Sequence, residues 1–245
     1  MTRSGASPRE PLRLLGVLGG MSWTSTEVYY RLLNAGVAER LGGLHSARVL
    51  VHSVDFDEIA ALQHAGDWAG TAEILGEAAR GLAAAGAEGV LLATNTMHKV
   101  ADAVERAAGL PLLHIADATA DAVRAAGLSR VGFLATAFTM EDTFIIDRLA
   151  TRGVEAVVPP AAARAEVHRI IYDELVLDVV HEESRTTYRE IMADLVAGGV
   201  QGMVLACTEI GLLVGADDTT VPVFDTTAIH AAAAVDWMAA VSPSR

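Results

Sequence analysis

The feature that most constrains this chain is the repetition of three short segments, in the same order, in its two halves. Residues 86–94 read Gly-Ala-Glu-Gly-Val-Leu-Leu-Ala-Thr, and residues 199–207 read Gly-Val-Gln-Gly-Met-Val-Leu-Ala-Cys. Two further pairs keep this order: 15–19 with 131–135 and, more loosely, 111–119 with 222–228. Chance similarity between Ala- and Gly-rich segments explains one such match more readily than three. The repetition therefore predicts two similar halves.

Short apolar runs alternate with stretches of helical length, such as 71–85 and 187–197. The runs lack polar alternation, which is typical of parallel strands covered on both faces. Regular alternation of strand and helix indicates an α/β fold. We therefore expect two pseudo-symmetric three-layer α/β/α domains, each with a parallel four-stranded sheet. The expected strands are 12–18, 47–53, 89–93, 112–115, 130–135, 154–158, 202–206 and 221–224.

The repeat also predicts the domain organisation. The first domain is expected at 12–118, with a C-terminal helix at 228–243 packed back onto it, and the second at 119–227. Residues 1–11 contain two prolines and few apolar residues, so we expect a loose tail there.

Charge and cysteine content exclude several classes of function. The formal net charge of −13 is spread along the chain and opposes nucleic-acid binding, which needs a basic surface. A small acidic substrate is still compatible, because the charge of a local pocket can differ from the net charge of the chain.

The single cysteine rules out an internal disulfide and is typical of a reducing cytoplasm. No apolar run approaches the ~18 residues of a membrane span, so we expect a cytoplasmic protein without a membrane partner.

A small reactive or polar residue follows one strand in each half. These residues are Thr94, before Asn95 and Thr96, and Cys207, before Thr208 and Glu209. Ligands of open α/β sheets bind outside the carboxyl ends of the strands. If the two halves face each other, Thr94 and Cys207 lie across one cleft.

Both loops also permit a purely structural interpretation. A strand-end cysteine near free backbone N–H groups and a helix start is expected to have a lowered pKa, but free cysteine also packs as a small apolar residue. Asn95 and Thr96 are ordinary helix-capping types, although the same N–H groups can hold a carboxylate.

The sequence predicts neither a cofactor nor a metal. Lys99 is the chain's only lysine and has no other signal of the Schiff-base lysine that pyridoxal phosphate requires. The glycine-rich turn after residue 18 lacks the G-x-G-x-x-G spacing, so its glycines either allow close approach of a ligand or make a tight turn. The histidines at 45, 52, 98 and 230 lack metal-ligand spacing.

Three segments taken together resemble the signatures of the aspartate/glutamate racemase superfamily. They are Leu-Gly-Gly-Met-Ser at 18–22, Thr-Asn-Thr-Met-His at 94–98 and Ala-Cys-Thr-Glu-Ile at 206–210. The longer strings at 19–23, 42–47 and 95–100 are similar to the bacterial subgroup specific for L-aspartate and L-glutamate. The resemblance runs from about residue 12 to 240.

The resemblance implies an activity and its catalytic residues. Family members racemise amino acids without pyridoxal phosphate or metal, at a site between two α/β halves, often as homodimers. Two residues, usually both cysteines, exchange the α-proton from opposite faces of the substrate. Cys207 matches the second of these, and Thr94 stands in place of the first, as it does in the subgroup that the chain resembles.

Threonine at this position implies asymmetric proton transfer. General acid–base catalysis works best when the pKa of the group lies near the working pH. An unactivated hydroxyl titrates far above that range, so Thr94 can donate a proton, or relay one from water, His98 or Glu209. We expect Cys207 to abstract readily from one enantiomer and the reverse direction to be slow.

The resemblance also implies a set of substrate-binding residues. Asn95, Thr96 and Thr208 match positions that hold the α-carboxylate and the amine. Met21 and Ser22 should form the floor, Ser53 and Gln63 should face the substrate, and Arg164 is the candidate for the distal carboxylate.

Other functions are compatible with these residues. Single-cysteine relatives include decarboxylases of disubstituted malonates, and hydantoin racemases and maleate isomerases share the scaffold. A racemase that has lost activity and is kept as a ligand-binding protein is a third possibility. The retained Asn95, Thr96 and Thr208 favour an amino-acid carboxylate.

Overall fold

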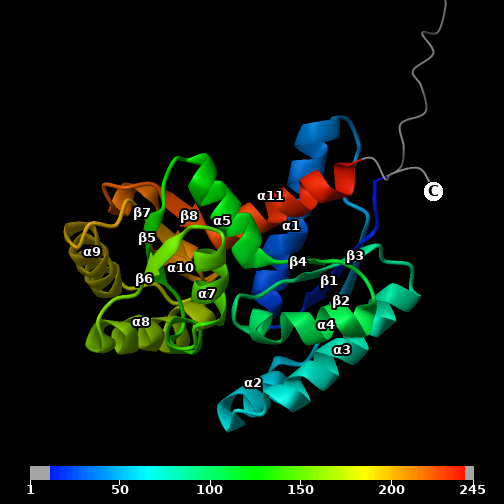
Figure 1. Ribbon diagram of the computed structural model, residues 1–245, viewed down its shortest axis with the longest axis horizontal. Helices are drawn as coiled ribbons and strands as arrows, with labels where there is room; N and C mark the ends of the chain where they lie inside the picture. The colour runs from blue at the N-terminus through cyan, green and yellow to red at the C-terminus, as the bar shows by residue number, and fades with distance from the viewer. Residues whose placement is uncertain (1–11, 241–245) are drawn as a thin grey trace, which may run out of the picture.

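The computed structural model describes residues 12–240, in which one or more helices follow each strand (Figure 1). The expected tail at 1–11 and the last residues of the expected helix 228–243, from 241 onward, lie outside this part.

The first half contains a parallel four-stranded sheet in the order β2-β1-β3-β4. The central strands β1 and β3 are buried along their whole length, as their apolar sequences predict. The edge strand β2 is exposed over its second half. The strands are β1 (Leu15–Gly19), β2 (Val49–Ser53), β3 (Gly89–Leu92) and β4 (Leu112–Leu113).

The second half repeats this topology in the order β6-β5-β7-β8, again entirely parallel. The strands are β5 (Arg130–Leu134), β6 (Glu155–Val157), β7 (Gly202–Leu205) and β8 (Val223–Asp225). All eight expected strands are thus present with ends shifted by a few residues, and the expected α/β fold with two parallel four-stranded sheets is confirmed.

Helices flank both sheets. In the first half they are α1 (Trp23–Leu41), α2 (Phe56–Ala65), α3 (Trp68–Ala84), the 3-10 helix η1 (Thr96–Val100) and α4 (Ala101–Ala108). Those that follow are α5 (Ile115–Ala125), α6 (Ala137–Glu141), α7 (Phe144–Thr151), α8 (Ala161–Asp173), η2 (Leu175–Leu177), α9 (Glu182–Ala197), α10 (Ile210–Leu213), η3 (Ala216–Asp218) and α11 (Thr226–Ala239). No helix within residues 12–240 is both long and apolar enough to cross a membrane.

Helix α11 follows the second sheet but lies against the first half, beside α1 (Figure 1). Its buried residues Ala231 and Val235 share a core with Tyr29 and Leu33 of α1. The proposed domain boundary at residue 118 falls inside α5, whose apolar side chains join the core of the second sheet. We retain the two-domain division as a proposal and assign α5 to the second half.

Three buried histidines lie where η1, α5 and α11 meet. His98 is 3% exposed, His114 is 8% exposed and His230 is fully buried. The ring centroids of His98 and His114 are 4.5 Å apart, and those of His98 and His230 are 5.7 Å apart. Burial lowers the pKa of His230 to about 4, and burial reinforced by the Arg148 charge lowers the pKa of His114 to about 3. These side chains are therefore neutral in the folded protein at neutral pH.

The histidine cluster predicts acid lability. Below the ordinary histidine pKa of about 6.5, the unfolded chain binds protons that the folded chain excludes, so stability falls as pH drops toward 4. His230 alone should account for about 3 kcal/mol of lost stability at pH 4. Urea denaturation at pH 7.5, 6 and 5 measures this loss, and a His230→Asn variant should show a shallower dependence. Equal midpoints at pH 7.5 and 5 would contradict the prediction.

Candidate active site

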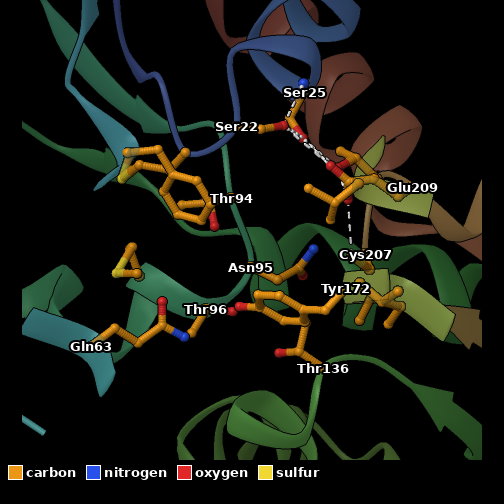
Figure 2. A pocket seen from close by; sticks show the side chains of 17 residues that line it. Ser22, Ser25, Gln63, Thr94, Asn95, Thr96, Thr136, Tyr172, Cys207 and Glu209 are labelled. Carbon is orange, nitrogen blue, oxygen red and sulfur yellow. Dashed lines mark hydrogen bonds between the residues drawn. The ribbon is translucent and has the colours of Figure 1, made fainter. Parts of the chain in front are cut away.

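A pocket opens between the two halves at the carboxyl ends of both sheets, where the topology predicts a ligand site (Figure 2). The first half contributes Met21, Ser22, Ser25, Phe56, Gln63, Thr94, Asn95, Thr96 and Met97 to its wall. The second half contributes Thr136, Ile171, Tyr172, Val176, Ala206, Cys207, Thr208 and Glu209.

Thr94 and Cys207 occupy equivalent places in the two sheets, just beyond the ends of β3 and β7. Figure 2 shows them on opposite sides of the pocket. Both side chains are partly exposed, in contrast to the fully buried strands that precede them. The structure therefore brings together the two residues that the repeat had paired. Within residues 12–240, the Thr94 hydroxyl has no hydrogen-bond partner, so it is available to a ligand.

The turn after β1 forms one side of the pocket, and Gly20 is essential to it. Gly20 has a φ of +95°, and a Cβ there would lie 2.2 Å from the Val54 carbonyl oxygen. Its N–H donates to Thr26 Oγ1 at 2.8 Å, which fixes the start of α1. The close approach is thus to the backbone after β2, and it carries Met21 and Ser22 into the pocket wall.

Glu209 joins the two halves at the side of Cys207. This carboxylate is only 9% exposed, and it accepts from Ser22 Oγ at 3.2 Å and Ser25 Oγ at 3.1 Å, both of the first half. From its own loop it accepts from Thr208 Oγ1 at 2.6 Å. It also accepts from Cys207 Sγ at 3.0 Å, a bond that Figure 2 shows as a dashed line. Four donors hold the carboxylate in place, so its contact with the thiol is well defined.

The expected lowering of the thiol pKa is wrong. Burial raises the pKa of Cys207 well above its usual range, and the neighbouring Glu209 charge raises it further. Helix α10, whose dipole was expected to favour the thiolate, has only four residues. Cys207 is therefore a neutral thiol that donates to a carboxylate. A positively charged ligand group beside Glu209 would oppose that charge and favour the thiolate.

His98 is not placed to relay a proton to the Thr94 hydroxyl. Its Nδ1–H donates to the Thr94 carbonyl oxygen at 2.7 Å, and its Nε2 accepts from the Ile115 N–H at 3.2 Å. Both ring nitrogens are thus used by the backbone. Glu209 contacts Cys207 directly, which makes it a partner of the thiol.

Most of the predicted binding residues lie in the pocket wall. These are Met21, Ser22, Gln63, Asn95, Thr96 and Thr208. Ser53 and Arg164 are outside it. Ser53 is exposed at the end of β2, next to Gly20. The Arg164 guanidinium donates to the Pro159 carbonyl oxygen at 3.0 Å and forms an ion pair with Glu141 at 3.4 Å.

The structure adds residues that the sequence did not select. The sequence named Glu209 only as a possible source of a proton for Thr94, and not as the partner of Cys207. Ser25 could have been selected, because it lies three residues after Ser22. Thr136 follows β5 as Gly20 follows β1, so the repeat itself could have indicated it. Tyr172 of α8 has no such signal, and its place depends on how the halves pack.

The charge of the pocket is negative. Glu209 is the one carboxylate among its lining residues, all of which lie in the described part of the chain, and no Lys or Arg is among them. An ammonium group is therefore favoured next to Glu209. Any carboxylate of a ligand must be held by neutral donors, such as Asn95, Gln63 and the hydroxyl groups.

The fold and the site together define an α/β protein of two parallel sheets with one small-molecule pocket between their carboxyl ends and a thiol–carboxylate pair in its wall. The Asp/Glu/hydantoin racemase family matches residues 18–234. The chain therefore belongs to that family, which is one of racemase-type enzymes.

Solved structures agree with this membership. A Yersinia pestis protein assigned to the Asp/Glu racemases is 53% identical, with a TM-score of 0.89, over 93% of this chain and 99% of that one. An aspartate racemase homologue from Pyrococcus horikoshii is 31% identical, with a TM-score of 0.80, over 92% and 98% of the two chains. The aspartate racemase of Picrophilus torridus, at 19% identity and a TM-score of 0.70 over 91% and 93%, shows the fold alone.

Proposed function

We propose that the protein racemises acidic amino acids, aspartate and glutamate, without a cofactor, by moving the α-proton between Cys207 and Thr94. The observation that carries the proposal is the placement of these two side chains on opposite sides of one pocket. A racemase needs one group on each face of the α-carbon. The kinship with a protein assigned to the Asp/Glu racemases supports the substrate class.

Cys207 and Glu209 form the proton-abstracting side. Glu209 takes the proton of the thiol at 3.0 Å while the substrate ammonium stabilises the negative charge nearby. The thiolate then removes the α-proton, whose electron pair stays on the substrate as a carbanion. A thiolate is a competent base near neutral pH, whereas a thiol is not.

Thr94 forms the delivering side. Its hydroxyl gives a proton to the opposite face of the carbanion, and water then reprotonates Thr94. Glu209 releases to water the proton that it took from the thiol, so both groups return to their starting state. A carbanion is far more basic than an alkoxide, so delivery is favourable even though the hydroxyl is a poor acid. Asn95 and Thr96, in the same loop, are suited to hold the α-carboxylate.

The experiment that tests the proposal incubates the protein with L-aspartate or L-glutamate in D2O. Proton NMR follows loss of the α-proton, and chiral chromatography follows the enantiomers. Exchange together with inversion is expected. L-Asparagine and L-glutamine serve as controls whose side chains are uncharged. They are needed because no Lys or Arg lines the pocket to bind a side-chain carboxylate. No exchange with either acid would refute the substrate class, and disubstituted malonates and hydantoins would be assayed next.

A Thr94→Cys variant should raise kcat/KM about tenfold, because a thiol can both accept and deliver the proton near neutral pH. The two enantiomers have equal free energy in solution, so kcat/KM must rise by the same factor in both directions. Any asymmetry of the native protein can therefore appear only in kcat and KM separately. Chiral assays from both enantiomers measure this.

The matched control for this variant is Thr94→Val, which keeps the shape and removes the hydroxyl. It should retain label exchange at the Cys207 face and lose inversion. Unchanged inversion in Thr94→Val would mean that Thr94 does not deliver the proton.

An Arg164→Ala variant should leave KM for either acid within about twofold, because its guanidinium is held by Pro159 and Glu141 outside the pocket wall. Steady-state kinetics measure this, with Gln63→Ala, a change in the wall, expected to raise KM. A tenfold rise of KM in Arg164→Ala would mean that the guanidinium contacts the bound substrate.

A homodimer in the cytoplasm is part of the same proposal. Exposed apolar side chains support an interface that includes the open edge of the first sheet: Val51 of β2 is 45% exposed, and Trp23 and Tyr30 of α1 are 69% and 53% exposed. Light scattering coupled to gel filtration distinguishes a dimer from a monomer.

A further inference from the structure

The buried histidine cluster adjoins the active site at one point, which is His98. Its side chain donates to the Thr94 carbonyl oxygen at 2.7 Å, and its backbone N–H donates to the Asn95 carbonyl oxygen at 3.1 Å. One residue thus holds two successive carbonyls of the loop that carries Thr94.

The orientation of the His98 ring is itself fixed. Because Nε2 accepts from the Ile115 N–H at 3.2 Å, the ring proton must be on Nδ1, which is the nitrogen that faces Thr94. The ring is 3% exposed and is enclosed by the rings of His114 and His230. Burial also lowers the pKa of His98 well below its usual range, which keeps this neutral tautomer.

These two hydrogen bonds determine how the loop faces the pocket. In a trans peptide group the N–H points opposite to the carbonyl. With the Thr94 and Asn95 carbonyls turned toward His98, the N–H groups of Asn95 and Thr96 point away from it. His98 does not line the pocket, whereas Asn95 and Thr96 do. Within residues 12–240, no group accepts from these two N–H groups, so they remain available to a ligand.

We propose that His98 is a positioning residue: by holding the Thr94 and Asn95 carbonyls, it aims the Thr94 hydroxyl and the two adjacent N–H groups at the substrate. The proposal rests on the proposed function in one respect, the role of Thr94 as proton donor. The Cys207 side of the site has a different device, the carboxylate of Glu209, and does not depend on His98. The two faces of the reaction should therefore respond differently to changes at His98.

The test uses three variants of the full-length protein. His98→Leu removes the donor at similar size, and His98→Asn retains an N–H near the position of Nδ1. His230→Leu is the matched control, because His230 is equally buried in the same cluster but bonds to Tyr29 and to the Leu113 carbonyl instead of the loop. Each variant is assayed in D2O for inversion and for label exchange without inversion.

In His98→Leu the ratio of inversion to retained exchange should fall at least about tenfold, because a small misplacement of a catalytic group is costly. In His98→Asn this ratio should return most of the way to the native value, and in His230→Leu it should equal the native value. A merely structural role would lower both rates together and leave the ratio as in the native protein, which would overturn the proposal.

Crystal structures of the same variants give a readout independent of turnover. The Thr94–Asn95 peptide should be turned from its native orientation in His98→Leu and be in place in His98→Asn. A native peptide orientation in His98→Leu would overturn the proposal whether or not the protein is a racemase. A turned peptide in a protein that racemises neither acid would uphold the positioning role and refute the proposed function alone.

Discussion

Replacing Cys207 with serine should reduce both α-proton exchange and racemisation by about 10²-fold to 10⁴-fold, the range typical of losing an acid–base group. Serine keeps the size of the side chain and its hydrogen bond to Glu209. It titrates far above a thiol, however, so the basic form is almost absent. In the proposed reaction Thr94 acts as the donor and cannot replace it. Proton NMR in D2O and chiral chromatography measure the two losses.

The serine variant must also be shown to fold. Its melting temperature should be close to that of the native protein, because Cys207 is partly exposed at the pocket wall and serine is similar to it in size. Thr94→Val is the informative comparison, since it should lose inversion but keep exchange. If the serine variant retained exchange near the native rate, another group would be the base and the proposed mechanism would be wrong.

The sequence was sufficient to predict the sheets and the two facing loops, and the reason is physical. Strands of a parallel sheet with helices on both faces are continuous apolar runs, so all eight could be predicted, even β4, which pairs through only Leu112 and Leu113. Carboxyl ends of parallel strands meet at one edge, so Thr94 and Cys207 could be paired from the repeat. The position of α5 was harder to predict, because its apolar face is compatible with the core of either half. Only the packing in the structure assigns it to the core of the second half.

The remaining site residues depended on information that a sequence does not contain. Tyr172 reaches the pocket from α8 only because the halves pack in one particular way. Arg164 is in the same helix, yet its side chain turns to Glu141 and Pro159. The direction of the Cys207 pKa shift could not be predicted from the sequence. It depends on burial and on the Glu209 carboxylate, whose effects on the thiol pKa outweigh that of the short helix α10. Glu209 lies within the motif at 206–210, but its contact with Sγ depends on the orientation of its side chain, which the sequence does not specify.

Glu209→Gln should lower kcat/KM about 10²-fold, because glutamine keeps the shape of the side chain but has one acceptor oxygen instead of two and cannot take the proton of the thiol. The same change should alter the pH profile in a defined direction. Glu209 raises the pKa of Cys207, so its neutralisation should lower that pKa. Activity that depends on the thiolate rises with pH, and this rise should therefore begin at lower pH in the variant, toward a much lower maximum.

Two roles of Glu209 can be separated by these measurements because they predict opposite signs. If the carboxylate accepts the thiol proton, its loss slows the reaction at neutral pH. If it only opposes the thiolate, its loss increases the thiolate fraction and speeds the reaction, which would contradict our proposal. Alkylation by iodoacetamide as a function of pH reports the thiol pKa directly, since Cys207 is the only cysteine in the chain. A Glu209→Asp variant completes the comparison. It keeps the charge while withdrawing the oxygen from Sγ, so it should retain a raised thiol pKa and still lose activity.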